Sequence, residues 1–164
     1  MNGYIPFAAM AVLAGIGFVK LADLPSNHPA QNQQRVAVEP QRSGEAVAYR
    51  KNGHFMFNAA MNGRNVRVLV DTGASGVAIN ESTARRIGLQ LKDSDFTGQA
   101  STANGKTAFA RANIKRIEIG GVTARNVAAM VLRDEALGGT LLGMSFLNKL
   151  SRFEFDGNRL TLVQ

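Results

Sequence analysis

The sequence contains no cysteine among its 164 residues. Thiolate nucleophiles, disulfides, and zinc or iron–sulfur sites built on cysteine are therefore excluded. A chain without cysteine folds equally well in reducing and oxidising compartments, so this absence leaves the location of the protein open.

Histidine is almost absent, with only His28 and His54 in the chain. His28 lies in a polar stretch, and His54 opens an apolar run that has no nucleophile motif beside it. A Ser-His-Asp site needs a histidine next to its nucleophile, and a metal site needs more ligands. We therefore expect no serine-type hydrolase site, no metal and no other cofactor.

No long run of basic residues accompanies the formal net charge of +7. Before residue 48 the basic and acidic residues cancel, so the whole excess lies in residues 48–164. There the charges stand singly or in pairs between apolar positions, which favours a solvated basic surface over an anionic binding site. No nucleic-acid-binding motif is present, and we expect no nucleic acid as partner.

Charged side chains are also missing from Tyr4 to Val19. If Lys20 reaches toward the lipid headgroups, the apolar stretch Tyr4–Ala22 falls within the ~17–25 residues that span a bilayer. A membrane anchor over residues 1–22 competes with a cleaved signal peptide and a buried helix. The signal-peptide alternative lacks a Lys or Arg before the apolar run. Lys20 itself favours a cytoplasmic position for the rest of the chain.

Residues 23–47 have the composition of a flexible linker. Proline, asparagine, glutamine and serine dominate from Asp23 to Arg42, without any apolar periodicity. Such a segment cannot bury enough apolar surface to fold by itself. We therefore place a folded domain at residues 48–164.

Short apolar runs alternate with turn signals throughout residues 48–164. Asn62-Gly63 between two such runs is a strong hairpin signal. Asn80 is suited to cap a short helix, and Gly88 to end it. The spacing predicts an all-β closed barrel with one or two short helices. The expected strands are 54–61, 64–70, 77–79, 97–102, 107–113, 114–119, 122–131, 151–155 and 159–163, and the expected helices are 81–87 and 145–149.

Asp71 is the residue with the clearest chemical meaning. It follows Val68-Leu69-Val70, a run that is apolar on both faces and is therefore expected to be buried. A carboxylate at the end of a buried strand is costly unless it is hydrogen-bonded. Thr72, Gly73 and Ser75 offer hydroxyl and backbone N–H donors beside it.

Hydrolysis by carboxyl groups requires a pair, one ionised to activate water and one protonated. None of the other aspartates, which are Asp23, Asp93, Asp95, Asp134 and Asp156, stands in a comparable Asp-Thr/Ser-Gly frame. The second carboxylate is therefore expected from a second copy of the chain, across a two-fold axis.

The segment Val-Leu-Val-Asp-Thr-Gly-Ala-Ser at 68–75 resembles the active-site motif of pepsin-like and retroviral aspartic proteases. Leu141-Leu142-Gly143 is similar to the second element of that family, which packs against the catalytic loop. The resemblance covers about residues 48–164 and implies a single-lobed pepsin/retropepsin-like barrel. It also implies a flap at Ala103-Asn104-Gly105-Lys106 and a dimer-forming terminal strand at Arg159–Gln164.

The same resemblance implies a role for each residue of the motif. Asp71 would be the catalytic acid and base, and Thr72 would grip its counterpart across the dimer axis. Gly73 would donate its N–H to the carboxylate, and Ser75 would bond the outer carboxylate oxygen. Retroviral enzymes usually carry Asp at the position of Ser75. The supporting residues would be Ala74, Leu142 and Gly143.

The chain looks closest to bacterial membrane-anchored retropepsin-like proteases. That likeness implies an inner-membrane anchor, a periplasmic catalytic domain, a homodimer and peptide or protein substrates. It disagrees with the orientation that Lys20 favours, and we follow the resemblance. The alternative function is a membrane-tethered module that binds peptides in the same barrel without cleaving them.

Overall fold

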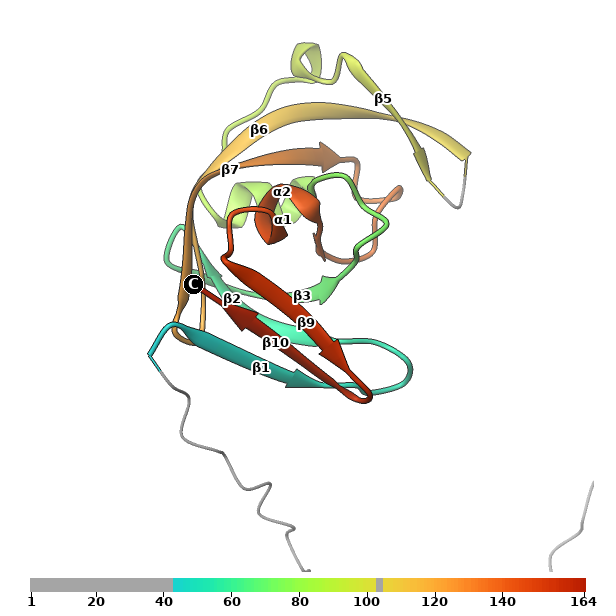
Figure 1. The fold of residues 1–164 in the computed structure, drawn as a ribbon. Coiled ribbons are helices and arrows are strands. Elements are labelled where there is room, and N and C mark those ends of the chain that lie inside the picture. The colour runs from blue at the N-terminus through green and yellow to red at the C-terminus, as the bar shows by residue number, and fades with distance from the viewer. Residues whose placement is uncertain (1–42, 103–104) are drawn as a thin grey trace, which may run out of the picture. The chain divides into compact units, whose positions relative to one another are not determined.

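The computed structural model describes residues 43–102 and 105–164 (Figure 1). The expected anchor at residues 1–22 and the linker up to residue 42 lie outside the described residues, as do Ala103 and Asn104 of the expected flap. Within these described ranges, no helix is long and apolar enough to cross a membrane.

Strands dominate the fold, as the alternation of short apolar runs predicts. They are joined by two short α-helices and one 3₁₀ turn. The strands are β1 (Glu45–Tyr49), β2 (Met56–Met61), β3 (Arg64–Val70), β4 (Val77–Asn80), β5 (Gly98–Thr102), β6 (Gly105–Ile119), β7 (Val122–Leu132), β8 (Leu141–Leu142), β9 (Arg152–Asp156) and β10 (Arg159–Val163). The helical elements are α1 (Glu81–Arg86), η1 (Asp93–Asp95) and α2 (Met144–Leu147).

The larger sheet closes on itself into the expected barrel. Its strand order is β2-β3-β8-β4-β7-β6-β5, and β6 pairs back with β2 where Met61 lies opposite Ile117. This pairing covers the free edge of β2 and leaves β5 as the remaining edge strand. The barrel encloses the main apolar core. Ile79, Ile114 and Phe146 are among its fully buried side chains.

Two features of the barrel differ from a simple meander of hairpins. β3 pairs in parallel with β8, and β4 pairs in parallel with β7. The segments expected at 107–113 and 114–119 form the single strand β6, which pairs with β7 from Phe109 to Ile119. No glycine or proline separates these segments, so nothing in the sequence interrupts the strand.

The Asn-Gly pair predicted to form a hairpin turn does so. Asn62 and Gly63 both have positive φ, of 49° and 79°, as the type I′ turn between β2 and β3 requires. Asn52 and Gly53 make a similar turn, closed by a bridge between Lys51 and His54. The chain therefore turns before β2, which starts at Met56 and not at His54.

The helices also lie close to their expected positions. The side chain of Asn80 accepts a hydrogen bond from the Thr83 N–H at the start of α1, and Gly88 follows the helix with φ +83°. The second helix, α2, begins at Met144 and ends at Leu147, one residue earlier at its start than predicted and shorter at its end.

A separate three-stranded sheet has the order β1-β10-β9. Three residues that we assigned to the linker, Glu45 to Val47, lie in β1, because β10 offers them a backbone partner that the sequence alone does not reveal. The strand β10, which resemblance suggested as a dimer-forming edge, lies in the middle of this sheet. Both of its edges are occupied by strands of the same chain.

Candidate active site

Asp71 lies immediately after β3, at the point where β3 runs beside β8. The Leu69 N–H donates to the Thr140 carbonyl at 2.9 Å, and the Asp71 N–H donates to the Leu142 carbonyl at 3.2 Å. Residues 140–142 therefore hold the backbone of the segment that ends at Asp71. The Asp71 side chain is half-buried at this junction.

The turn after Asp71 brings a backbone donor to its carboxylate. The Gly73 N–H donates to Asp71 Oδ1 at 2.9 Å, and the Ala74 N–H donates to the Asp71 carbonyl at 3.3 Å. A Cβ atom on residue 73 would lie 3.2 Å from Asp71 Oδ1. Glycine therefore allows the chain to fold tightly back over the carboxylate and to fix its direction.

Gly143 brings the two motif segments into backbone contact. A Cβ atom on this residue would lie 2.2 Å from the Gly76 carbonyl oxygen and 2.6 Å from that of Ala74. The Met144 N–H also donates to the Ala74 carbonyl at 2.9 Å. Any side chain at position 143 would push the turn of residues 71–76 away from α2.

Ser145 supports the same turn and was not singled out in the sequence. Its Oγ accepts a hydrogen bond from the Val77 N–H at 2.8 Å and donates one to the Ala128 carbonyl at 2.7 Å. One hydroxyl thus joins α2 to β4 and to β7. The only sequence signal was its place two residues after Gly143, in the first turn of a predicted helix.

The hydroxyl residues of the motif are not bonded to the Asp71 carboxylate in this chain. Thr72 and Ser75 are exposed, and neither makes a hydrogen bond to Asp71 in the described part of this single chain. Ala74 and Leu142 support the turn, the first through its backbone and the second from a fully buried position. The roles inferred for the two hydroxyl groups stay predictions.

Asp71 lines a cavity of about 800 Å³. One wall is β5, which supplies Gln99, Ala100 and Ser101 and is an edge strand of the sheet. The opposite wall is the loop after β7. The remaining lining residues are Gly73, Ala74, Ser75, Ala78, Phe109, Arg111, Met130, Leu132, Ala136, Leu137, Gly138 and Leu141.

In Figure 1 the β5–β6 hairpin projects over the loop that follows β3, and the resemblance places a flap at the tip of this hairpin. Gly105 and Lys106 are the first residues of β6. Farther along β6, the Arg111 guanidinium lies 5.6 Å from the centre of the Phe109 ring, and both side chains line the cavity. The wall below the flap therefore combines an aromatic face with a cation.

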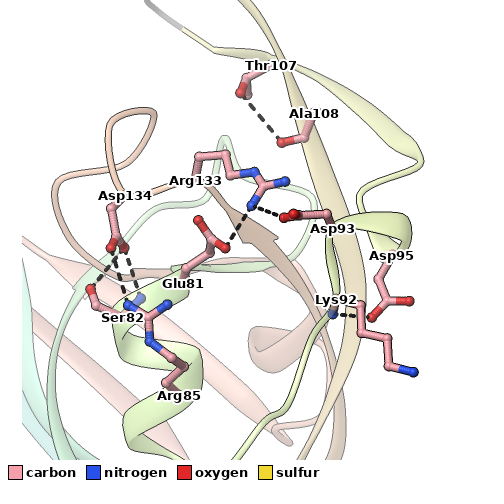
Figure 2. A network of polar contacts seen from close by, with 10 residues as sticks. All are labelled: Glu81, Ser82, Arg85, Lys92, Asp93, Asp95, Thr107, Ala108, Arg133 and Asp134. Atoms are coloured by element: carbon pink, nitrogen blue, oxygen red, sulfur yellow. Dashed lines mark hydrogen bonds and ion pairs between the residues drawn. The ribbon is translucent and has the colours of Figure 1, made fainter.

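A polar network fixes the loop of residues 133–139, which forms part of the cavity wall (Figure 2). Arg133 pairs with Glu81 at 2.9 Å and with Asp93 at 3.0 Å, and its guanidinium stacks 3.7 Å from the Phe96 ring centre. The hydrogen bond to Asp93 is the main cause that raises the pKa of Arg133 above its ordinary value.

Asp134 holds the next position of this loop against α1. Its Oδ1 accepts from both the N–H and the hydroxyl of Ser82 at 2.9 Å, and Arg85 lies 3.8 Å from Oδ2. The Ser82 backbone donor, followed by the Ser82 hydroxyl, holds the pKa of Asp134 below its ordinary value. The cavity wall is thus anchored on a helix that follows directly after β4.

The chemistry available in this cavity is that of a carboxyl group. Asp71 is the one acidic residue among the described residues that line it. Within residues 43–102 and 105–164, no group of three acidic or histidine side chains could hold a metal ion. A single oriented carboxylate can accept a proton from water, but a second is needed for a donor on the other side.

Comparison with known proteins identifies the family of the chain. The model of the family described as gag-polyprotein putative aspartyl protease matches residues 57–149. An uncharacterized Sinorhizobium protein from the cobV 5′ region is 39% identical over 111 residues, covering 68% of this chain and 48% of the relative. An uncharacterized protein of Rickettsia prowazekii is 33% identical over 123 residues, covering 73% of this chain and 51% of the relative. The chain thus spans about half the length of these two relatives.

Solved structures show the same fold. A retropepsin-like aspartic protease from Rickettsia conorii superimposes with a TM-score of 0.63 at 32% identity, covering 74% of this chain and all of the other. The protease of EIAV, solved with the inhibitor HBY-793, superimposes with a TM-score of 0.51 over 62% of this chain and 91% of the other. Its identity of 17% makes the second likeness a statement about fold alone.

Proposed function

Because this chain belongs to the gag-polyprotein putative aspartyl protease family, we propose that it is an aspartic endopeptidase acting as a homodimer. The observation that carries the proposal is the catalytic turn. Asp71 stands at the end of β3, its carboxylate is oriented by the Gly73 N–H, and it opens into a cavity of about 800 Å³.

The proposed reaction uses Asp71 from each of two copies. Two carboxyl groups about 3 Å apart cannot both ionise, so one is a carboxylate and the other keeps its proton. The carboxylate takes a proton from a water molecule, whose oxygen bonds to the carbon of the scissile carbonyl. The protonated carboxyl donates a hydrogen bond to the carbonyl oxygen, and the C–N bond then breaks as the amine nitrogen accepts a proton.

An extended peptide is the substrate that suits this cavity. β5 is an edge strand that lines it, so its free backbone groups can bond a substrate backbone as an added strand. Phe109, Leu137 and Leu141 offer apolar surface to the substrate side chains. We infer that the loop anchored by Arg133 and Asp134 contributes to the choice of side chain.

The test compares the full-length wild type with Asp71→Asn on a diverse peptide mixture, from acidic to neutral pH, with products read by mass spectrometry. Asp95→Asn is the matched control, because Asp95 is exposed and does not line the cavity. Cleavage by the wild type and the control, but not by Asp71→Asn, is expected. Peptide binding without cleavage by a dimeric wild type would favour the non-catalytic module instead.

We also propose that residues 4–22 anchor the domain in the bacterial inner membrane, with the domain in the periplasm. The support is the uncharged apolar run and the family resemblance. Fractionation of cells expressing the full chain is expected to place it in the membrane, and deletion of residues 1–22 to release it. Protease added to spheroplasts should digest the domain. A domain protected in intact spheroplasts would contradict the orientation.

A further inference from the structure

A second cavity, of about 690 Å³, shares the loop of residues 133–139 with the cavity of Asp71. Leu137, Gly138 and Leu141 line both cavities. The other walls of the second cavity come from β3, from α1 and from the start of β2, and no residue of the turn 71–76 lines it. A peptide chain that leaves the Asp71 cavity over this loop therefore meets the second cavity next.

The second cavity has an apolar floor on the outer face of the barrel. Alternate residues of β3 face the core and the outside, so Arg67 and Leu69 share the outer face. Met56 on β2 and Leu141 on β8 lie opposite Leu69 on its two sides. Met56 remains 36% exposed. Three neighbouring strands thus present an uncovered apolar surface that can receive the methylene groups of a ligand.

The ionisable side chains of the second cavity are all basic. His54, Arg67 and Arg86 line it, and no acidic residue does so in the described part of the chain. Neither arginine has an ion pair or a hydrogen bond within residues 43–102 and 105–164. In contrast, Arg85 and Arg133, which hold the same loop, both have acidic partners. The positive charge of the cavity is therefore available to a ligand.

Two buried hydroxyl groups add uncharged donors to these cations. Thr83 and Thr140 are 8% and 5% exposed, and both line the second cavity. They are the only buried polar residues in the described ranges, and neither hydroxyl has a hydrogen-bond partner there. Buried polar groups are nearly always bonded, so two unbonded hydroxyls in one cavity indicate a site built for a polar ligand.

This set of groups selects the chemistry of the ligand. Guanidinium groups only donate, and an ionised carboxylate only accepts, so the two form charge-assisted hydrogen bonds that a neutral amide cannot match. Threonine hydroxyls can donate to the same oxygens. The methylene groups of an acidic side chain would lie on the apolar floor. Because the wall is shared with the Asp71 cavity, the carboxylate is best carried by a peptide bound there.

We propose that the second cavity binds an acidic side chain of the peptide substrate, outside the cavity that holds the scissile bond. The carboxylate lies between Arg67 and Arg86, within reach of the Thr83 and Thr140 hydroxyls. This inference rests on the proposed peptidase function and names a substrate class for it. Peptides with a Glu or Asp at a fixed distance from the cleaved bond are then preferred.

The first test measures binding without cleavage. The full-length Asp71→Asn chain is titrated with the blocked peptide acetyl-Ala-Leu-Glu-Glu-Leu-Ala-amide and with its Gln-Gln analogue, by calorimetry. The Glu peptide is expected to bind at least about fivefold more tightly. Adding Arg67→Gln and Arg86→Gln should abolish this difference. Equal binding of the two peptides to the Asp71→Asn chain would overturn the inference.

The matched control adds Arg64→Gln and Arg125→Gln instead. Both residues are exposed arginines that line neither cavity, so the same charge is removed elsewhere on the surface. The preference for the Glu peptide should survive this change. An equal loss in both double variants would show a general effect of net charge and would overturn the site. Binding of the Gln-Gln peptide only when its C-terminus is a free carboxylate would overturn the assignment to a side chain.

Thr140→Val tests the hydroxyl separately from the charges. Because this hydroxyl has no partner in the fold, its replacement by a methyl group of similar shape should not lower the urea midpoint. Affinity for the Glu peptide should fall by about threefold. A lowered urea midpoint with unchanged affinity would contradict the role of Thr140.

The last test uses the wild type and compares kcat/KM for peptides that differ only by Glu or Gln at the preferred position. The ratio is expected to be about five or more, and to fall toward one in Arg67→Gln/Arg86→Gln. Cleavage that is indifferent to acidic residues would overturn this inference and leave the peptidase in place. Selective binding of the Glu peptide without cleavage of any peptide would overturn the proposed function and keep the site.

Discussion

At the residue scale, the turn of residues 71–76 depends on glycine as much as on aspartate. Gly73 places an N–H 2.9 Å from the Asp71 carboxylate, and Gly143 lets two loops touch through their backbones. Neither residue takes part in the chemistry. Both determine where the carboxylate points, and therefore how two such groups can face one another.

Gly143→Ala is expected to be strongly destabilising. The added methyl group would lie 2.2 Å from the Gly76 carbonyl oxygen, where the neighbours are backbone atoms that cannot rotate away. We expect a loss of about 3 kcal/mol or more in the free energy of unfolding, measured by urea denaturation, and loss of cleavage.

Gly138→Ala is the matched control for this change. Residue 138 has ordinary backbone geometry, and its Cβ would meet nothing within 4 Å, so the free energy of unfolding should change by less than about 1 kcal/mol. Equal stability of the two variants would show that the loops tolerate separation, contrary to the packing described above.

Part of the geometry around Asp71 can be predicted from the sequence. Asp71 was predicted because a lone carboxylate followed a buried strand, and Gly143 because it resembled the second family element. Ser145 was missed, because a serine in a short helix is an ordinary residue until its partners on β4 and β7 are known. Its role depends on pairs that are distant in the sequence.

At the scale of elements, α1 and the loop of residues 133–139 act as one unit. Asp134 links them through Ser82, and Arg133 links both to η1 (Figure 2). The wall of the cavity is thus held by ion pairs and hydrogen bonds, and not by apolar packing alone. The ionisation state of Asp134 should therefore affect the stability of the loop of residues 133–139.

The pKa of Asp134 is lower in the folded chain than its ordinary value of 3.8, mainly because of the Ser82 N–H and hydroxyl. A carboxyl group with a lowered pKa contributes stability above its unfolded pKa and loses that contribution as the pH falls through the folded pKa. The contribution of Asp134 should therefore be fully present at neutral pH and decline below about pH 4.

Asp134→Asn is expected to be less stable than the wild type at pH 7, with the difference narrowing below pH 4. Urea denaturation at a series of pH values measures this difference. Glu135→Gln, which changes the exposed neighbouring residue, is the control and should track the wild type. A gap between wild type and Asp134→Asn that stays constant down to pH 3 would contradict the assignment.

The sequence also predicted most elements, because strand alternation and Asn-Gly turns are local signals. The all-β retropepsin-like fold is confirmed. The sequence could not predict which strands pair when they are distant along the chain. The parallel pairs of β3 with β8 and of β4 with β7 exist only because a partner strand is present, as do the three residues of β1 that lie in the expected linker.

At the scale of the whole molecule, the single chain is half of the proposed enzyme. Among the described residues that line the cavity there is one acidic side chain, Asp71. The proposed acid–base chemistry requires two carboxyl groups. In the proposed homodimer the second copy supplies the other carboxyl from its own Asp71.

Mixing experiments can test this whole-molecule proposal directly. When wild type is equilibrated with a threefold excess of Asp71→Asn chains, random exchange leaves most wild-type chains in heterodimers that hold one ionisable carboxyl. Because both carboxyls are needed, cleavage per wild-type chain is expected to fall to about one quarter of its unmixed value.

The matched control mixes wild type with a threefold excess of Asp95→Asn chains, whose changed residue is exposed and does not line the cavity. Cleavage per chain that keeps Asp71 should then be unchanged. Inhibition by Asp71→Asn alone would indicate that catalysis needs an Asp71 from each of two chains. Inhibition by neither, with subunit exchange verified, would indicate that one chain is sufficient for cleavage.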